Sequence, residues 1–244
     1  MELPGIFVLL YTMYTLPSVL LLTTPLPREN WLMAWMFTIH YVYRAIISPL
    51  LLNPSMSPIH PYVWVSAIIF NTINALSIAG WLAGHGPTDR SYWSLRFGPI
   101  QVGMTLWAFG LLGNMYHDDE LREIRRAAAR TQKKREAKEK EEVLGEDKAT
   151  DRKDQRKTKG VDKVYLLPRN GLFEIVLFPH YLCEWVEWAG FYMVGGLGCL
   201  PARNFLINEI ATMTPRALAG KRWYIERFGR DQVGNRKAVV PFVL

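Results

Sequence analysis

Blocks of about twenty consecutive apolar residues dominate this chain, and an α-helix needs about that length to cross the hydrocarbon core of a bilayer. Short segments rich in Pro, Asn, Gly and Ser separate the blocks and are typical of turns. The sequence therefore predicts an all-α fold, a polytopic bundle of transmembrane helices. The five clearest spans are residues 3–22, 31–52, 61–83, 97–116 and 172–195.

A sixth segment, residues 200–219, is apolar at many positions but also carries polar side chains, which cannot face lipid at such density. Either the segment lies at the membrane surface, or it crosses with its polar groups turned toward a hydrated or ligand-filled cavity. We favour the crossing, which makes six spans. The polar side chains are Arg203, Asn204, Asn208, Glu209, Thr212 and Thr214.

A densely charged segment, residues 118–163, separates the fourth and fifth spans and must lie outside the membrane. Within it, residues 122–142 place opposite charges three or four positions apart, which predicts a solvated helix, and residues 145–160 are expected to be disordered. Because basic loops stay cytoplasmic, we expect this segment and the basic tail, residues 221–237, on the cytosolic side.

Charge and cysteine content exclude other classes of protein. The net charge is +7, but the basic residues stand beside apolar spans without a nucleic-acid-binding motif, so we expect no nucleic-acid partner. The two cysteines, Cys183 and Cys199, lie in apolar surroundings and are expected to be buried and reduced. The first apolar block has no basic stretch before it, so we predict no cleaved signal peptide.

Ionisable side chains inside a span are candidates for function, because each costs several kcal/mol unless it is paired or faces water. His180, Glu184 and Glu187 follow spacings of four and three residues, which puts polar groups on one side of the fifth span. That spacing could indicate a metal site, but further ligands are not apparent, so we expect a hydrogen-bonded network and no metal. The glycines within residues 195–198 are interpreted as a turn rather than a phosphate loop.

Five motifs, in order and at similar spacing, resemble those of the steroid 5α-reductase family. Residues 179–188, Pro-His-Tyr-Leu-Cys-Glu-Trp-Val-Glu-Trp, are similar to the family's Pro-Asn/His-Tyr-x-x-Glu-x-x-Glu-Trp, and residues 40–44 to its His-Tyr-x-x-Arg. Residues 113–118 resemble its segment with Gly, Asn and Asp, and residues 167–173 its Pro, Gly, Leu and Phe before a span. Residues 222–244 resemble the family's Trp/Phe-Tyr and Arg-Lys-Ala…Pro-Phe ending.

The family has seven membrane helices, and residues 2–4 resemble an internal segment that normally follows the first of them. We therefore expect that helix to be missing here, through a shortened gene model or natural truncation. By resemblance, residues 1–117 hold four spans and the substrate pocket, residues 118–163 are a charged cytosolic insertion, and residues 164–244 form a C-terminal reductase region with two spans.

The resemblance implies an oxidoreductase that reduces a carbon–carbon double bond conjugated to a carbonyl, with NADPH as cofactor. Tyr41 would donate a hydrogen bond to the carbonyl of the lipid substrate, and Glu2 would orient or polarise the pair. Either residue could instead be a structural anchor at the end of a span. The residues implied in NADPH binding are Asn114, Asp118, Arg122, Arg125, His180, Glu184, Trp188, Arg216, Tyr224 and Arg236.

Some positions depart from the family pattern or admit a second interpretation. Residues 219–221, Ala-Gly-Lys, stand where the family commonly has a His pair, and His180 stands where steroid-reducing members often have Asn. Arg122 and Arg125 could serve only as positive charges that fix topology.

A 3-oxo-Δ4 steroid or sterol-like enone is the favoured substrate, taken from the bilayer of the endoplasmic reticulum, while NADPH enters from the cytosol. Polyprenol or polyprenal reduction and enoyl-CoA reduction would use the same hydride step. An isoprenylcysteine methyltransferase-like enzyme and an inactive membrane scaffold are also compatible with the sequence.

Overall fold

The computed structural model describes residues 1–53, 59–145 and 166–243, and regular structure in these ranges is helical apart from one isolated β-bridge. The segment predicted to be disordered lies outside the described residues, apart from Gly145. The long helices are α1 (Leu3–Val19), α2 (Arg28–Val42) continued by η1 (Tyr43–Leu52), α3 (Pro61–Gly80) continued by η2 (Trp81–His85), α5 (Phe97–Gly145), α6 (Pro179–Gly195) and α7 (Leu200–Phe228). The short ones are α4 (Arg90–Ser94), η3 (Gly171–Glu174) and α8 (Arg230–Val233).

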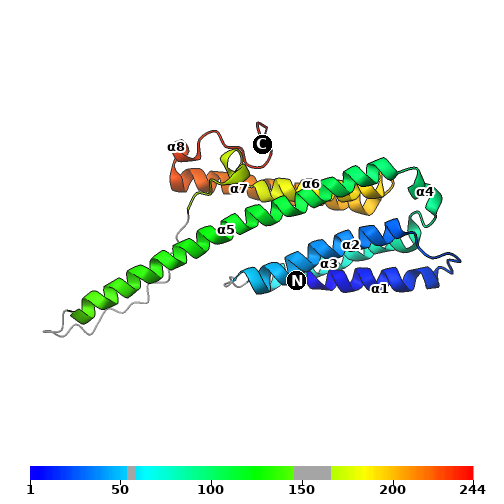
Figure 1. Cartoon of the computed structure of the whole chain (residues 1–244), viewed down its shortest axis with the longest axis horizontal. Coiled ribbons are helices and arrows are strands. Elements are labelled where there is room, and N and C mark those ends of the chain that lie inside the picture. The colour runs from blue at the N-terminus through cyan, green and yellow to red at the C-terminus, as the bar shows by residue number, and fades with distance from the viewer. Residues whose placement is uncertain (54–58, 146–165, 244) are drawn as a thin grey trace.

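The long helices form two groups of three (Figure 1). Helices α1, α2 and α3 pack together as one group, and α5, α6 and α7 as the other. Contacts of α2 with α6 and of α3 with α7 join the groups. The amino terminus, the end of η1 and the tail after α7 all lie toward the end of the bundle from which α5 projects.

Glycines bring α5 and α6 into backbone contact. A Cβ atom on Gly110 would lie 2.4 Å from the backbone nitrogen of Glu187, and one on Gly190 would lie 2.5 Å from the carbonyl oxygen of Gly103. A Cβ on Gly113 would lie 2.8 Å from the sulfur of Cys183, which is buried and reduced, as is Cys199. Small residues allow this approach, which is typical of helix pairs in membranes.

Each of the six predicted spans contains a long helix, but several boundaries are wrong. The first helix ends at Val19 rather than at residue 22, and the sixth continues to Phe228 rather than ending at residue 219. The fifth helix begins at Pro179 rather than at residue 172, because residues 175–178 leave the helical conformation and pair with the tail. The segment predicted as a solvated helix is confirmed as a continuation of α5, and residues 196–199 form the predicted turn. Of the six predicted spans, one described helix, Pro61–His85, is by itself long and apolar enough to cross a membrane, and Leu3–Val19 is a shorter apolar helix.

The favoured interpretation of residues 200–219 required their polar side chains to face a cavity, and the structure does not place all of them there. Arg203, Asn204 and Thr212 are exposed. Glu209 differs, because it lies between Phe205 and Met213 on the buried face of the helix.

The carboxyl-terminal tail is tied to the segment that precedes α6. The Leu177 backbone N–H donates to the carbonyl of Lys237 at 2.9 Å, and that of Phe178 donates to Ala238 at 2.9 Å. The guanidinium of Arg236 donates to four backbone carbonyls on both sides of this pairing. The acceptors are Pro168 at 3.0 Å, Phe173 at 3.3 Å, Gln232 at 2.7 Å and Val233 at 2.8 Å.

Candidate active site

Arg44 joins three helices in the interior of the bundle. Its guanidinium lies 3.6 Å from the carboxylate of Glu184 on α6 and 3.8 Å from that of Glu2, at the start of α1. Arg44 follows α2 within η1, where the hydrogen-bond ladder changes from α to π. A π turn shifts the phase of a helix and is frequent at functional sites.

Asn114 holds the opposite side of Glu184. Its side-chain amide donates to the Glu184 carboxylate and to the backbone carbonyl of His180, each at 3.1 Å. The Nδ1 atom of His180 is buried, with no hydrogen-bond partner among the described residues. A buried polar atom without a partner costs free energy, so it marks a place where a ligand group would be stabilised.

Tyr41 lies in an aromatic cluster one helical turn away from Arg44. His40 Nδ1 is 2.7 Å from a carboxylate oxygen of Glu187, and both residues are buried. Their neighbours are the rings of Phe37, 4.4 Å from that of Tyr41, and of Trp188, 4.8 Å from that of His40. Tyr41 is 4% exposed, and no hydrogen bond of its hydroxyl occurs within the described part of the chain.

Arg122 is buried at the point where α5 leaves the bundle. Its guanidinium donates to the hydroxyl of Tyr43 at 2.7 Å and to the carboxylate of Asp119 at 3.3 Å. The carboxylate of Asp118 lies 3.9 Å away. This cation is already bound to three protein groups, which supports a structural role for it.

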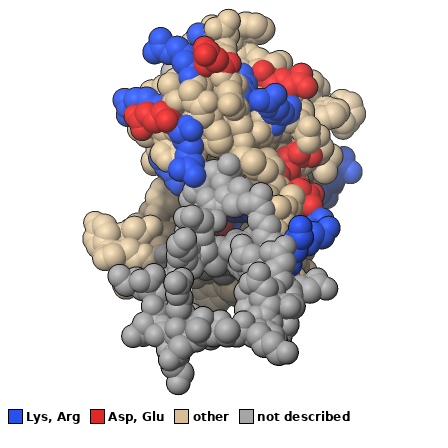
Figure 2. All heavy atoms as spheres, turned by 90° about the vertical axis from the view of Figure 1, so that its left-hand side faces the viewer, with Lys and Arg blue, Asp and Glu red and all other residues tan. Residues whose placement is uncertain are grey.

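A second basic group lies at the same end of the molecule, around Tyr224 on α7. Burial raises the pKa of the Tyr224 hydroxyl, and the positive charges of Arg125 and Arg236 oppose that rise. Burial also lowers the pKa of Arg236, as does the neighbouring charge of Arg169. Figure 2 shows basic and acidic side chains interspersed over the part of this end that carries α7, α8 and the tail.

The predicted site residues thus fall into an interior group and a basic group at the end of the bundle. The interior group consists of Glu2, Tyr41, Asn114, His180, Glu184 and Trp188, and the end group of Arg122, Arg125, Tyr224 and Arg236. Asp118 links the two groups, because it pairs with Arg122 and interacts electrostatically with Arg44 and His180. Arg216 is exposed and contributes to neither group through a hydrogen bond or ion pair with a described residue. No direct bond joins Glu2 to Tyr41; Glu2 is linked to the site through Arg44.

Arg44 and His40 were not predicted as site residues, and Glu187 was predicted only as a member of a hydrogen-bonded network. Each was visible as an ionisable residue inside a span, and each belongs to a family-like motif. Glu209 was noticed only as an unusual polar residue. Its spacing of four residues from Phe205 and from Met213 was the signal that it faces inward.

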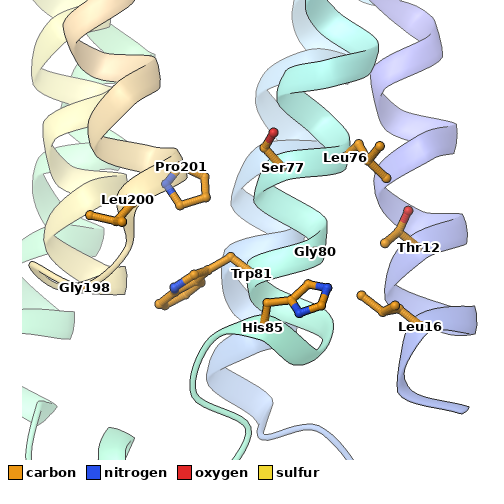
Figure 3. Close-up of a pocket in the computed structure, with 10 residues that line it drawn as sticks. All are labelled: Thr12, Leu16, Leu76, Ser77, Gly80, Trp81, His85, Gly198, Leu200 and Pro201. Carbon is orange, nitrogen blue, oxygen red and sulfur yellow. The ribbon is translucent and has the colours of Figure 1, made fainter. Parts of the chain in front are cut away.

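A hollow of about 660 Å³ lies at the other end of the bundle (Figure 3). Trp81 and His85 stand between α1 and the start of α7, where Leu200 and Pro201 line the opposite side. None of the predicted site residues lines this hollow.

Comparisons with known proteins agree with the motifs. The family model for 3-oxo-5-alpha-steroid 4-dehydrogenase matches residues 146–244. An uncharacterized protein of Schizosaccharomyces pombe is 37% identical over 212 residues, which cover 87% of this chain and 67% of that protein. Steroid 5-alpha-reductase DET2 of Solanum lycopersicum is 29% identical over 239 residues, 94% of this chain and 71% of the relative. The 3-oxo-5-alpha-steroid 4-dehydrogenase 1 of Mus musculus is 26% identical over 209 residues, 86% and 67% of the two chains.

This all-helical protein with a polar interior site is similar to oxidoreductases that act on steroids. The chain belongs to the steroid 5α-reductase family.

Proposed function

We propose that this protein reduces a carbon–carbon double bond conjugated to a carbonyl in a lipid substrate, with NADPH as the hydride donor. A 3-oxo-Δ4 steroid or a sterol-like enone is the first substrate class to test, because relatives from several mammals carry the name 3-oxo-5-alpha-steroid 4-dehydrogenase 1. The observation that carries the proposal is the hydroxyl of Tyr41. It is a donor on a buried residue, it has no acceptor among the described residues, and it lies close to the ion pairs of Arg44.

Two groups of residues fit the two parts of one NADPH molecule, the nicotinamide and the phosphates. In the interior, the orphaned Nδ1 of His180 and the carboxylate of Glu184 could bind the polar groups of the nicotinamide end. At the end of the bundle, Arg125 and Arg169 offer positive charge of the kind that phosphates require. When bound, NADPH supplies a hydride to the β-carbon of the conjugated bond.

Tyr41 would stabilise the charge that develops on the substrate oxygen. A hydroxyl donor aimed at such an oxygen in a site that excludes water is commonly worth about 3 kcal/mol or more. Phe37 and Trp188 surround the ring of Tyr41 and limit access of water to it. Arg44, fixed between Glu2 and Glu184, holds a positive charge close to the same hydroxyl.

The proposed setting is a membrane of the endoplasmic reticulum, crossed by six helices, with α1 to α3 and α5 to α7 as the spans. The end of the bundle that carries Arg125 and the tail would face the cytosol, where NADPH is available. Tyr41 would then lie within the membrane, where a lipid substrate can reach it from the bilayer.

The test is turnover by the purified, detergent-solubilised protein with NADPH and a 3-oxo-Δ4 steroid. We expect loss of absorbance at 340 nm together with a product about two mass units heavier, since the reaction adds a hydride and a proton. Tyr41→Phe should lower kcat roughly 100-fold while leaving NADPH binding intact, by removal of one oxyanion donor.

Tyr14→Phe is the matched control, because Tyr14 is 80% exposed on α1 and should not affect turnover. If the protein reduces polyprenals or enoyl thioesters but not the steroid, the proposed substrate class is wrong and the proposed hydride transfer is retained. Failure of the wild-type protein to bind NADPH would refute the proposal.

A further inference from the structure

Glu209 is an acidic residue on the buried face of α7. The buried residues of this helix are Ala202, Phe205, Met213 and Ala217. Glu209 follows Phe205 by four residues and precedes Met213 by four, so helical periodicity turns its side chain to the same side. Phe205 packs against Trp188, with ring centroids 4.5 Å apart, which places this face of α7 beside the aromatic cluster around Tyr41.

The charged groups of the site lie within electrostatic range of Glu209. Its carboxylate interacts electrostatically with Glu184, Arg44 and Glu2, and also with Tyr41 and His40. Arg44 is already within ion-pair distance of Glu2 and Glu184. No hydrogen bond or ion pair from a described residue reaches the side-chain carboxylate of Glu209, which is half-buried.

Four carboxylates, those of Glu2, Glu184, Asp118 and Glu209, therefore interact with the guanidinium of Arg44, and that of Glu209 alone has no hydrogen bond or ion pair within the described ranges. A polar group in an apolar interior is costly unless a hydrogen-bond donor meets it. A hydroxyl on the substrate can supply that donor, because it enters together with the lipid and leaves with it.

We infer that Glu209 accepts a hydrogen bond from a hydroxyl group of the substrate, and that the preferred substrate is a hydroxylated lipid enone. This inference rests on the proposed reductase function and narrows its substrate class. Glu209 would be a specificity-determining residue, whereas Tyr41 binds the conjugated carbonyl. A substrate that lacks the hydroxyl cannot form this hydrogen bond and would leave the Glu209 carboxylate without a donor.

The test compares pairs of 3-oxo-Δ4 steroids that differ by one ring hydroxyl, with the full-length protein and NADPH. For at least one pair, the wild type should favour the hydroxylated member about tenfold to hundredfold in kcat/KM, the usual worth of one hydrogen bond to a charged group. Glu209→Gln keeps an acceptor oxygen but loses the charge, so it should retain a preference of only about fivefold. Glu209→Leu should abolish the preference and still reduce the member without the hydroxyl.

Glu226→Leu is the matched control, since Glu226 is exposed on the same helix. A preference that survives in Glu209→Leu, or the absence of any preference in the wild type, overturns the inference and leaves the reductase proposal standing. Weaker NADPH binding by Glu209→Leu would assign Glu209 to the cofactor site and also overturn it. A wild type that reduces no enone at all would refute both proposals.

Discussion

The interface of α5 with α6 and the region where α7 meets the first three helices differ in what their residues contact. Between α5 and α6, glycines let the backbones touch, and Asn114 donates a hydrogen bond to Glu184 across the interface. Two buried side-chain atoms of this interface, Nε1 of Trp107 and Oε2 of Glu187, have no described partner. Between α7 and the first group of helices, Tyr41 and Glu209 offer side-chain oxygens to which no described residue is bonded. The first region fixes the positions of the helices through backbone contact, whereas the second joins side chains without close contact of the backbones and leaves oxygens that a ligand can bind.

The largest expected effect comes from filling the closed interface. Gly110→Leu should abolish folding, because a Cβ at this position already lies within 2.4 Å of backbone that cannot move aside. Overpacking commonly costs about 1–3 kcal/mol, and a backbone clash should exceed that range. The measurement is the yield and melting temperature of the monodisperse protein in detergent. Gly98→Leu in the same helix is the control, since no atom lies within 4 Å of a Cβ there. Similar yields and melting temperatures of the two variants would show that the α5–α6 interface has room for a side chain at position 110.

A smaller effect is expected at Arg236, and it tests whether this arginine is bound to the protein or available to a ligand. Arg236→Gln removes donors to four backbone carbonyls, so the tail should detach from the segment before α6. A loss of about 2 kcal/mol would speed hydrogen exchange of the Leu177 and Phe178 amides roughly 30-fold. Arg230→Gln, at an exposed position on α8, should leave that exchange unchanged. Unaltered exchange in Arg236→Gln together with weaker NADPH binding would move Arg236 to the ligand-binding side of the comparison.

The smallest effect is expected at Arg125, which is exposed and lies near Tyr224. Arg125→Gln should weaken NADPH binding about tenfold at low salt through loss of one charge-assisted hydrogen bond, and less at high salt because ions screen the charge. Nucleotide fluorescence titrations at two salt concentrations measure this difference. Arg130→Gln, farther along α5, is the control. Equal affinities for the wild type and Arg125→Gln would leave Arg125 with a role in topology alone.

The positions of the long helices could be predicted from the sequence, because each depends mainly on about twenty neighbouring residues. The start of α6 could not, since Leu177 and Phe178 pair with a tail about sixty residues away. Glycines at positions 103, 110 and 190 were visible, but the contacts between them depend on which two helices pack together.

The site was predictable only in part for the same reason. Tyr41, Asn114 and Glu184 stand out through their motifs, whereas the central role of Arg44 arises from the packing of α1, η1 and α6. Glu209 lies outside every motif, and its inward orientation needed the burial pattern of the whole helix.

Helix α5 continues without interruption from the interior of the bundle to Gly145. Because an α-helix rises about 1.5 Å and turns about 100° per residue, residues 118–145 reach about 40 Å along one axis. This projecting part of α5, the rod, therefore fixes the direction in which each side chain leaves the helix axis as well as its distance from the bundle. Deleting one residue within it would shift its far end by about 1.5 Å and rotate that end by about 100°, while Asn114 and its contacts stay in place. Any partner that binds both the rod and the bundle would therefore be sensitive to helical register.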